Sequence, residues 1–172
     1  MAKLRKGVSY RRLERPYTRK SKYKSLSYVR STPTNKVVRF DMGNYVKKFP
    51  HKVLLVSKAD IQLRNNEIES ARMACIRLLE GTLGKNGFRF QVRVYPHHIL
   101  RENPLAAGAG ADRMSTGMQR SFGKCIGLAA QVKKGKTIFS VDVDKVNLDT
   151  AKRALKSASH KFACQTIITQ EY

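Results

Sequence analysis

The chain has 172 residues, which is enough for one hydrophobic core of ordinary size and short for two independent domains. Its 35 lysines and arginines against 12 acidic residues give a net charge of +23, which few metabolic enzymes approach. Such self-repulsion would be relieved by a phosphate backbone, so nucleic acid is the predicted partner. No apolar run nears 18 residues and no signal-peptide pattern follows Met1, so we expect no membrane insertion and a cytoplasmic location.

Residues 1–36, here called the arm, form a basic segment without hydrophobic periodicity, in which Glu14 is the only acid. Four tyrosines lie among its cations, and such rings can stack on bases between phosphate contacts. We expect the arm to order on RNA; the alternative, a solvated and disordered tail, is less consistent with the tyrosines. Its predicted RNA-binding residues are Arg5, Lys6, Arg11, Arg12, Arg15, Tyr17, Arg19, Lys20, Lys22, Tyr23, Lys24 and Tyr28.

Residues 37–172 are predicted to form a single α+β domain. A short apolar strand at 53–56 can continue with a bend through Ile61 and Leu63. A helix follows, with Asn66 placed to cap it and Glu69 three positions later in a capping-box arrangement. The stop is predicted at Gly84. The apolar stripe of this helix contains Ile68, Ala71, Cys75, Leu78, Leu79 and Leu83.

Strict alternation over residues 88–95 predicts a strand with one packed face and one face toward water or RNA. Residues 123–132 and 137–143 are predicted to form a hairpin with a cationic tip at 133–136. A second helix begins after Asn147, and the last strand spans 163–169. This order indicates a two-layer sandwich, a mainly antiparallel sheet with two helices on one face. Predicted RNA contacts in this domain are Arg89, Arg93, Lys124, Lys133, Lys134 and Lys136.

Residues 96–121 are too long for a routine hairpin loop and too poor in periodicity for another core element. The stretch AAGAGA at 106–111 carries almost no side chain, so it can approach another backbone closely and enter a cleft in folded RNA. A disordered loop is the alternative, and both hold if the loop orders only in place.

No catalytic or metal site is predicted. Five residues separate Gly117 from Gly123 where a phosphate-binding loop needs four, and Cys125 replaces its Ser or Thr. His97 and His98 are adjacent, so their side chains should diverge rather than share a metal ion. The three cysteines form no CxxC pair and are interpreted as reduced, mostly buried thiols. We therefore expect a non-enzyme without cofactor, metal or small-molecule substrate.

Nearly the whole chain resembles the universal large-subunit ribosomal protein family sixteen, in its archaeal and eukaryotic branch, with the archaeal form the closer match. The resemblance is carried by VRVYPHHILR at 92–101, GAGADRMSTGM at 108–118, FGK at 122–124, and RRLERPYTRKSKYKSLSYVRS in the arm. It implies a non-catalytic constituent of the large subunit near the base of the central protuberance. Its implied partners are large-subunit rRNA, neighbouring ribosomal proteins and A-site tRNA. The implied tRNA-site residues are His97, His98, Arg101, Gly108, Gly110, Ala111, Asp112 and Arg113.

Overall fold

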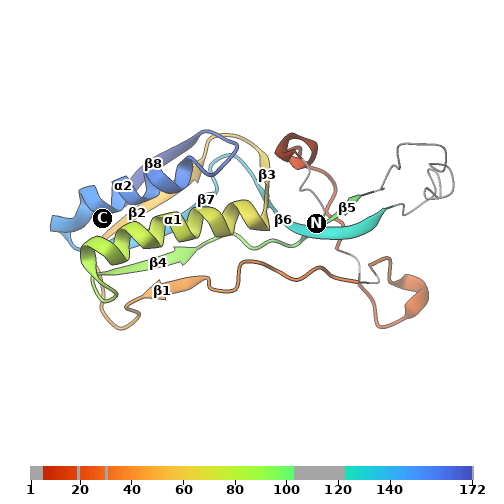
Figure 1. The fold of residues 1–172 in the computed structure, drawn as a ribbon, viewed down its shortest axis with the longest axis horizontal. Coiled ribbons are helices and arrows are strands. Elements are labelled where there is room, and N and C mark those ends of the chain that lie inside the picture. Colours follow the sequence, from red (N-terminus) through yellow and green to blue (C-terminus); the bar gives the residue numbers. More distant parts are fainter. Residues whose placement is uncertain (1–5, 19, 30, 103–122, 172) are drawn as a thin grey trace.

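The computed structural model describes residues 6–18, 20–29, 31–102 and 123–171, and combines two antiparallel sheets with two helices (Figure 1). The larger sheet has the strand order β1-β4-β7-β2-β8, and the smaller sheet has the order β3-β6-β5. The predicted α+β class is confirmed, although the strands divide between two sheets. Neither helix in the described part of the chain has the length and hydrophobicity that a membrane crossing requires. The strands are β1 Asp41–Gly43, β2 His51–Ser57, β3 Ile61–Arg64, β4 Phe88–Val92, β5 His98–Glu102, β6 Lys124–Val132, β7 Thr137–Val143 and β8 Thr166–Glu171.

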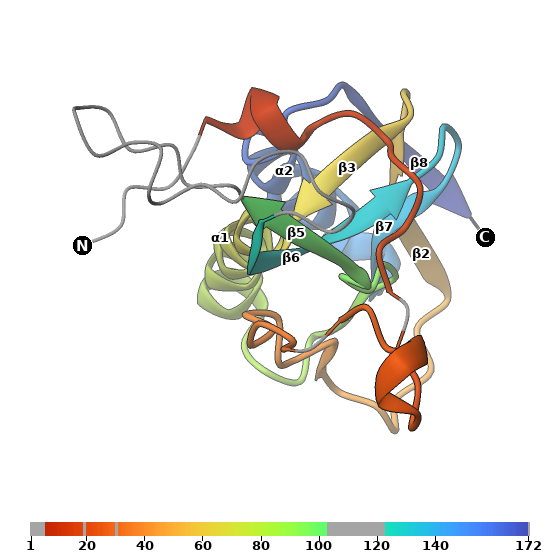
Figure 2. The ribbon, with the colours of Figure 1, turned by 90° about the vertical axis from the view of Figure 1, so that its right-hand side faces the viewer.

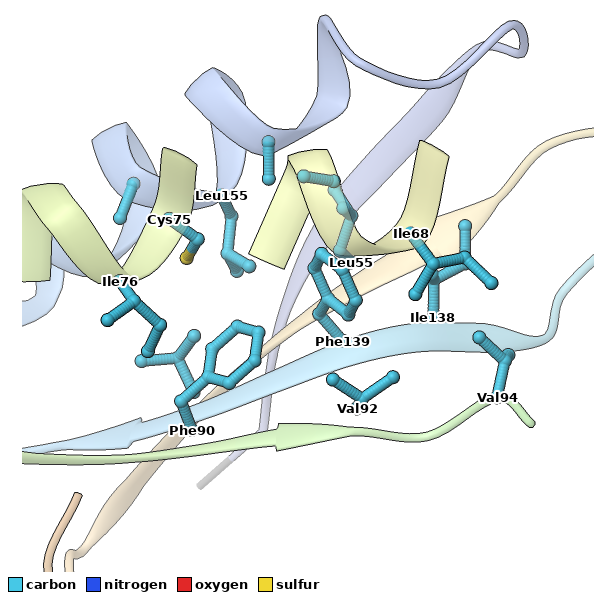
Figure 3. Packing of buried hydrophobic residues seen from close by; sticks show 14 of the residues in the cluster. Leu55, Ile68, Cys75, Ile76, Phe90, Val92, Val94, Ile138, Phe139 and Leu155 are labelled. Carbon is cyan, nitrogen blue, oxygen red and sulfur yellow. The ribbon is translucent and has the colours of Figure 1, made fainter. Parts of the chain in front are cut away.

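The hydrophobic core lies between the five-stranded sheet and the two helices, α1 (Asn65–Leu83) and α2 (Leu148–Ser159). Figure 3 shows Phe90 and Phe139 pointing from the sheet toward the helices, where Cys75 and Leu155 meet them. The two phenyl rings pack at a tilt with centroids 5.1 Å apart, a favourable aromatic geometry. All four side chains are fully buried, so this layer holds the larger sheet and both helices together.

Strand β4 confirms the alternation predicted from its sequence. Phe88, Phe90 and Val92 are buried against the helices, whereas Arg89 and Gln91 face away from them. The alternation continues past the strand, where Val94 is buried and Tyr95 is exposed. This works because successive side chains on a strand point to opposite faces of its sheet.

The helices lie where the hydrophobic periodicity puts them, but the predicted capping box of α1 is wrong. Helix α1 begins at Asn65, so Asn66 is inside the first turn, and no side chain forms a cap hydrogen bond. Glu69 pairs with Arg72 instead of reaching back to the helix start. Asn147 does precede α2, again without a side-chain cap bond. Gly84 follows the last residue of α1, as predicted.

The predicted hairpin of residues 123–143 is wrong, because its two strands belong to different sheets. Strand β7 pairs with β2 in the larger sheet, and β6 pairs with β3 in the smaller one. The bend predicted after β2 is present and leads into β3. The chain therefore passes between the two sheets twice, from β2 to β3 and from β6 to β7, and the two passages are neighbours because β2 pairs with β7 and β3 with β6. The basic turn 133–136 connects β6 to β7 at this place.

Strand β5 corrects the prediction that residues 96–121 form one loop. His98, Ile99 and Leu100 are buried, and the strand pairs with β6 in a register that places Glu102 opposite Lys124. With only two aliphatic residues before Arg101, β5 is too short to give a recognisable strand pattern. The final strand is also displaced, since it was predicted at 163–169 and β8 spans Thr166–Glu171.

Candidate nucleic-acid interface

The first part of the arm crosses the small sheet and is held there by two buried or half-buried glutamines. The backbone N–H of Gln62 donates to the carbonyl oxygen of Arg11 (2.9 Å), and its side-chain amide donates to that of Tyr10 (2.9 Å). The side-chain amide of Gln131, on the neighbouring strand β6, donates to the carbonyl oxygen of Glu14 (2.7 Å). The arm backbone thus uses polar groups of the sheet, which leaves its arginine side chains exposed.

Tyr17 ties the arm to the edge of β5. Its backbone N–H donates to Nδ1 of His98 (2.8 Å), and its carbonyl oxygen accepts from the backbone N–H of Ile99 (3.2 Å). The guanidinium of Arg101 lies over its ring, 3.8 Å from the centroid. The phenol donates to the carbonyl oxygen of Tyr28 (2.7 Å), which closes the turn between them.

After this turn the arm returns on the other side of the small sheet. Val29 is buried with Ile99 and Leu128, and Tyr17 and Cys125 border this second cluster. Figure 2 shows the arm passing from above β3, around the small sheet, to the orange turn below. The arm was expected to order on RNA, whereas these described residues already pack on the protein. Tyr17 in particular was predicted to stack on RNA, but Arg101 covers its ring.

The turn of the arm, residues 20–28 and here called the arm turn, presents cations and aromatic rings to solvent. Tyr23 is 60% exposed and Tyr28 is 52% exposed. Lys22 places its ammonium 5.2 Å from the Tyr23 ring centroid, a surface cation–π contact. Lys20, Lys22 and Lys24 are all exposed. This combination can stack on unpaired bases while neutralising phosphates.

The basic turn, residues 133–136, is a second cationic surface with a fixed backbone. The backbone N–H of Lys134 donates to Oδ1 of Asp60 (2.6 Å), and Gly135 N–H donates to the carbonyl oxygen of Ser57 (2.9 Å). Lys136 N–H bonds back to the carbonyl oxygen of Lys133 (3.1 Å). All three lysine side chains are exposed, so a rigid turn presents them together.

The predicted contacts on β4 lie in a different electrostatic setting. Arg89 is paired in register with Asp142, which is flanked on its other side by Lys52. Burial raises the pKa of the Asp142 carboxyl, and the nearby Lys52, Arg89 and Arg93 oppose that rise. Arg93 is exposed and its guanidinium donates to Oε1 of Gln91 (2.7 Å). The carboxyl of Asp142 therefore lies among the cations of this group and offsets part of their charge.

The remaining predicted residues lie in or beside the strand pair β5–β6, along the arm, or outside the described ranges. Lys124 is exposed beside Glu102, and Arg101 is half-buried on the same strand pair. His97 is exposed, whereas His98 is 4% exposed. Lys6, Arg11, Arg12 and Arg15 are exposed along the arm. The predicted residues outside the described ranges are Arg5, Arg19, Gly108, Gly110, Ala111, Asp112 and Arg113.

The two adjacent histidines do not converge. Nδ1 of His97 lies 3.1 Å from the carbonyl oxygen of Tyr95, while Nδ1 of His98 accepts from Tyr17. Within the described ranges, no three His, Cys, Asp or Glu side chains come close enough together to hold a metal ion. All three cysteines are free, and burial raises the pKa of the Cys75 thiol to about 12. This thiol therefore has no nucleophilic thiolate near neutral pH.

Sequence reasoning missed Gln62 and Gln131, which anchor the arm. Their amides also contact each other, with Gln131 Nε2 donating to Oε1 of Gln62 (3.2 Å). The available signal was a polar residue among apolar neighbours in each strand, at Gln62 between Ile61 and Leu63 and at Gln131 before Val132. Such a residue indicates a buried polar contact without naming its partner.

Comparison with known proteins gives a consistent result over almost the whole chain. The model of the family described as Ribosomal protein L16p/L10e matches residues 13–169. A protein named large ribosomal subunit protein uL16 from Methanococcus maripaludis strain C5 is 48% identical over 170 residues, 97% of this chain and 95% of the relative. Its namesake from Methanococcus aeolicus is 44% identical over 168 residues, 96% and 94% of the two chains. The one from Archaeoglobus fulgidus is 43% identical over 162 residues, 94% and 90%.

Proposed function

Because the chain belongs to the ribosomal protein L16p/L10e family, we propose that the arm turn and the basic turn hold it on large-subunit rRNA, where it helps to position A-site tRNA. The chain is a structural constituent of the large ribosomal subunit and not an enzyme, and it works in the cytoplasm with rRNA and other ribosomal proteins. The proposed division of labour gives residues 1–36 to rRNA binding, and residues 101–113 to the tRNA site near the base of the central protuberance.

The observation that carries the rRNA part is the arm turn. Three exposed lysines and two exposed tyrosines lie on one segment, whose two ends are fixed to the small sheet by Tyr17 and Val29. Fixing the segment in advance reduces the conformational entropy lost on binding. Stacking rings suit unpaired nucleotides of folded RNA, and ammonium groups suit the adjacent phosphates.

Salt dependence of binding to a large-subunit rRNA fragment tests the electrostatic part. If about eight cations each neutralise a phosphate, log affinity should fall with log salt at a slope of about −6 to −7. Matched triple variants locate the contacts: Lys20, Lys22 and Lys24 replaced by Gln, against Lys152, Arg153 and Lys156 on the exposed side of α2. The arm-turn variant should lose affinity and slope while the α2 variant retains both. Equal losses, or a wild-type slope near zero, would contradict the proposal.

The tRNA part is tested at the loop. Replacing Gly108 and Gly110 by bulky residues should leave association with the subunit intact and impair A-site tRNA binding, because the stretch 106–111 then loses its capacity for close approach. An equal loss of rRNA docking would mean that this segment is an anchor for the protein rather than part of the tRNA site.

A further inference from the structure

Tyr17, His98 and Arg101 form one contact cluster where the arm meets the small sheet. Three interactions converge on Tyr17: its N–H on His98 Nδ1, its carbonyl oxygen on Ile99 N–H, and its ring under Arg101. The bond from Ile99 N–H joins two backbones, as in an added strand at the edge of β5, whereas the Tyr17 N–H donates to a side chain. The third covers the ring with a planar cation, an arrangement that favours guanidinium over ammonium.

We propose that Tyr17 and His98 are positioning residues, which together with Arg101 anchor the arm so that its turn faces rRNA. This inference rests on the proposed rRNA-binding function for its consequence, although the anchor itself can be measured without RNA. It reassigns Tyr17, which was expected to stack on a base, and His98, which was expected at the tRNA site. It also gives Arg101, where the proposed tRNA-site segment begins, a contact within the protein. Their partners lie within the protein.

The hydrogen bond from Tyr17 N–H to Nδ1 of His98 determines which protonation state of the imidazole the anchor needs. Nδ1 of His98 accepts from a backbone N–H, so the ring must be neutral with its proton on Nε2. A protonated imidazole has no acceptor, and it would place an N–H donor against the N–H of Tyr17. The anchor should therefore be present when His98 is neutral and lost when His98 is charged.

The surroundings of His98 set the pH range for this change. Burial lowers the pKa of the imidazole, as do the neighbouring His97 and Arg101 of β5, while Glu14 of the arm opposes them. Because the folded-state pKa lies below that of the unfolded chain, the contribution to stability is complete above about pH 6.5. It decreases as pH falls through the folded-state pKa. At neutral pH the anchor is closed.

Amide hydrogen exchange of the full-length protein, followed by NMR, tests the anchor directly. The readouts are the protection factors of the Tyr17 and Ile99 amides, the two N–H groups that form its hydrogen bonds. His98→Leu removes the acceptor and should lower the Tyr17 protection factor by roughly tenfold at pH 7, the effect of losing one partly buried hydrogen bond. In the wild type the same protection should fall as the pH is lowered from 7 through the folded-state pKa of His98, which burial holds below its usual value.

A conservative variant separates positioning from simple packing. In His98→Asn the Oδ1 atom can take the place of Nδ1 as acceptor and cannot titrate in this range. This variant should keep wild-type protection at pH 7 and lose the pH dependence. His160→Asn, at an exposed histidine after α2, is the matched control and should leave both amides unchanged. If His98→Leu keeps full protection, or His98→Asn retains the pH dependence, the proposed anchor is wrong.

RNA affinity of the same variants tests the consequence. His98→Leu should bind the rRNA fragment roughly tenfold more weakly without loss of any positive charge, and His98→Asn should restore binding. Loss of protection without loss of affinity would show that the anchor exists but does not position the arm turn for RNA. If the wild type itself fails to bind rRNA, the proposed function fails, while the exchange result still decides whether the anchor exists.

Discussion

Gly123 directly precedes β6, at the end of the small sheet where Glu102 of β5 pairs with Lys124 of β6. We call this end of the strand pair the neck, and replacement of Gly123 by Ala should strain its backbone. Gly123 has φ +98°, a backbone conformation that residues with a Cβ rarely adopt. A Cβ at this position would lie 3.0 Å from both the carbonyl carbon and oxygen of Glu102. Strain of this kind costs about 1–3 kcal/mol, and displacing the partner backbone adds to it. We expect Gly123→Ala to lower the free energy of unfolding by about 3 kcal/mol.

Two other glycines separate the causes of this loss. Gly135 also has positive φ (+80°), but a Cβ there would meet nothing within 4 Å, so Gly135→Ala should cost only the strain, about 1–2 kcal/mol. Gly127 on β6 has neither problem, and Gly127→Ala should change stability by less than about 0.5 kcal/mol.

Thermal unfolding of the three variants measures the series. The expected melting temperatures fall by about 6–12 °C for Gly123→Ala, by about 2–8 °C for Gly135→Ala, and by little for Gly127→Ala. If Gly123→Ala is as stable as Gly127→Ala, the reasoning about the neck is wrong.

Three further changes test other parts of the structure. Replacing the three lysines of the basic turn by Gln should reduce the salt slope of rRNA binding by about 2–3 in magnitude, with an unchanged melting temperature; an unchanged slope would exclude these phosphate contacts. Tyr23→Ala should weaken rRNA binding by about 1–3 kcal/mol while Tyr23→Phe binds as wild type; equal losses would implicate the hydroxyl instead of stacking. The Cys75 thiol, with its pKa raised to about 12 by burial, should resist alkylation at pH 8 until the protein is unfolded in urea; rapid labelling of the folded chain would contradict its burial.

The elements predicted correctly are those whose pattern is local. The alternation along β4 and the stripe from Ile68 to Leu79 on α1 each follow from the spacing of apolar residues within one element. The hairpin at 123–143 failed because Lys-Lys-Gly-Lys between two apolar runs has the composition of a hairpin turn. Which strands these runs pair with depends on β2 and β3, more than 60 residues away in sequence.

The sequence predicted which kinds of residue form the candidate site, but it did not predict which of them contact one another in the fold. Charge and tyrosine content indicated that the arm binds RNA, and the exposure of Tyr23 and Tyr28 is consistent with that role. Tyrosine content also placed Tyr17 among the predicted RNA contacts. The sequence does not show that Arg101 and His98, about 80 residues further along the chain, lie beside Tyr17 in the fold. Long-range contacts of this kind decide which of several similar residues is available to a partner.

Crosslinking from position 23 shows whether the arm turn lies on rRNA in the assembled large subunit, as proposed. A photoreactive amino acid at position 23 should crosslink to large-subunit rRNA in purified subunits, whereas the same group at position 17 should crosslink within the protein, to the region of β5. Strong rRNA crosslinks from position 17 with none from position 23 would contradict the account.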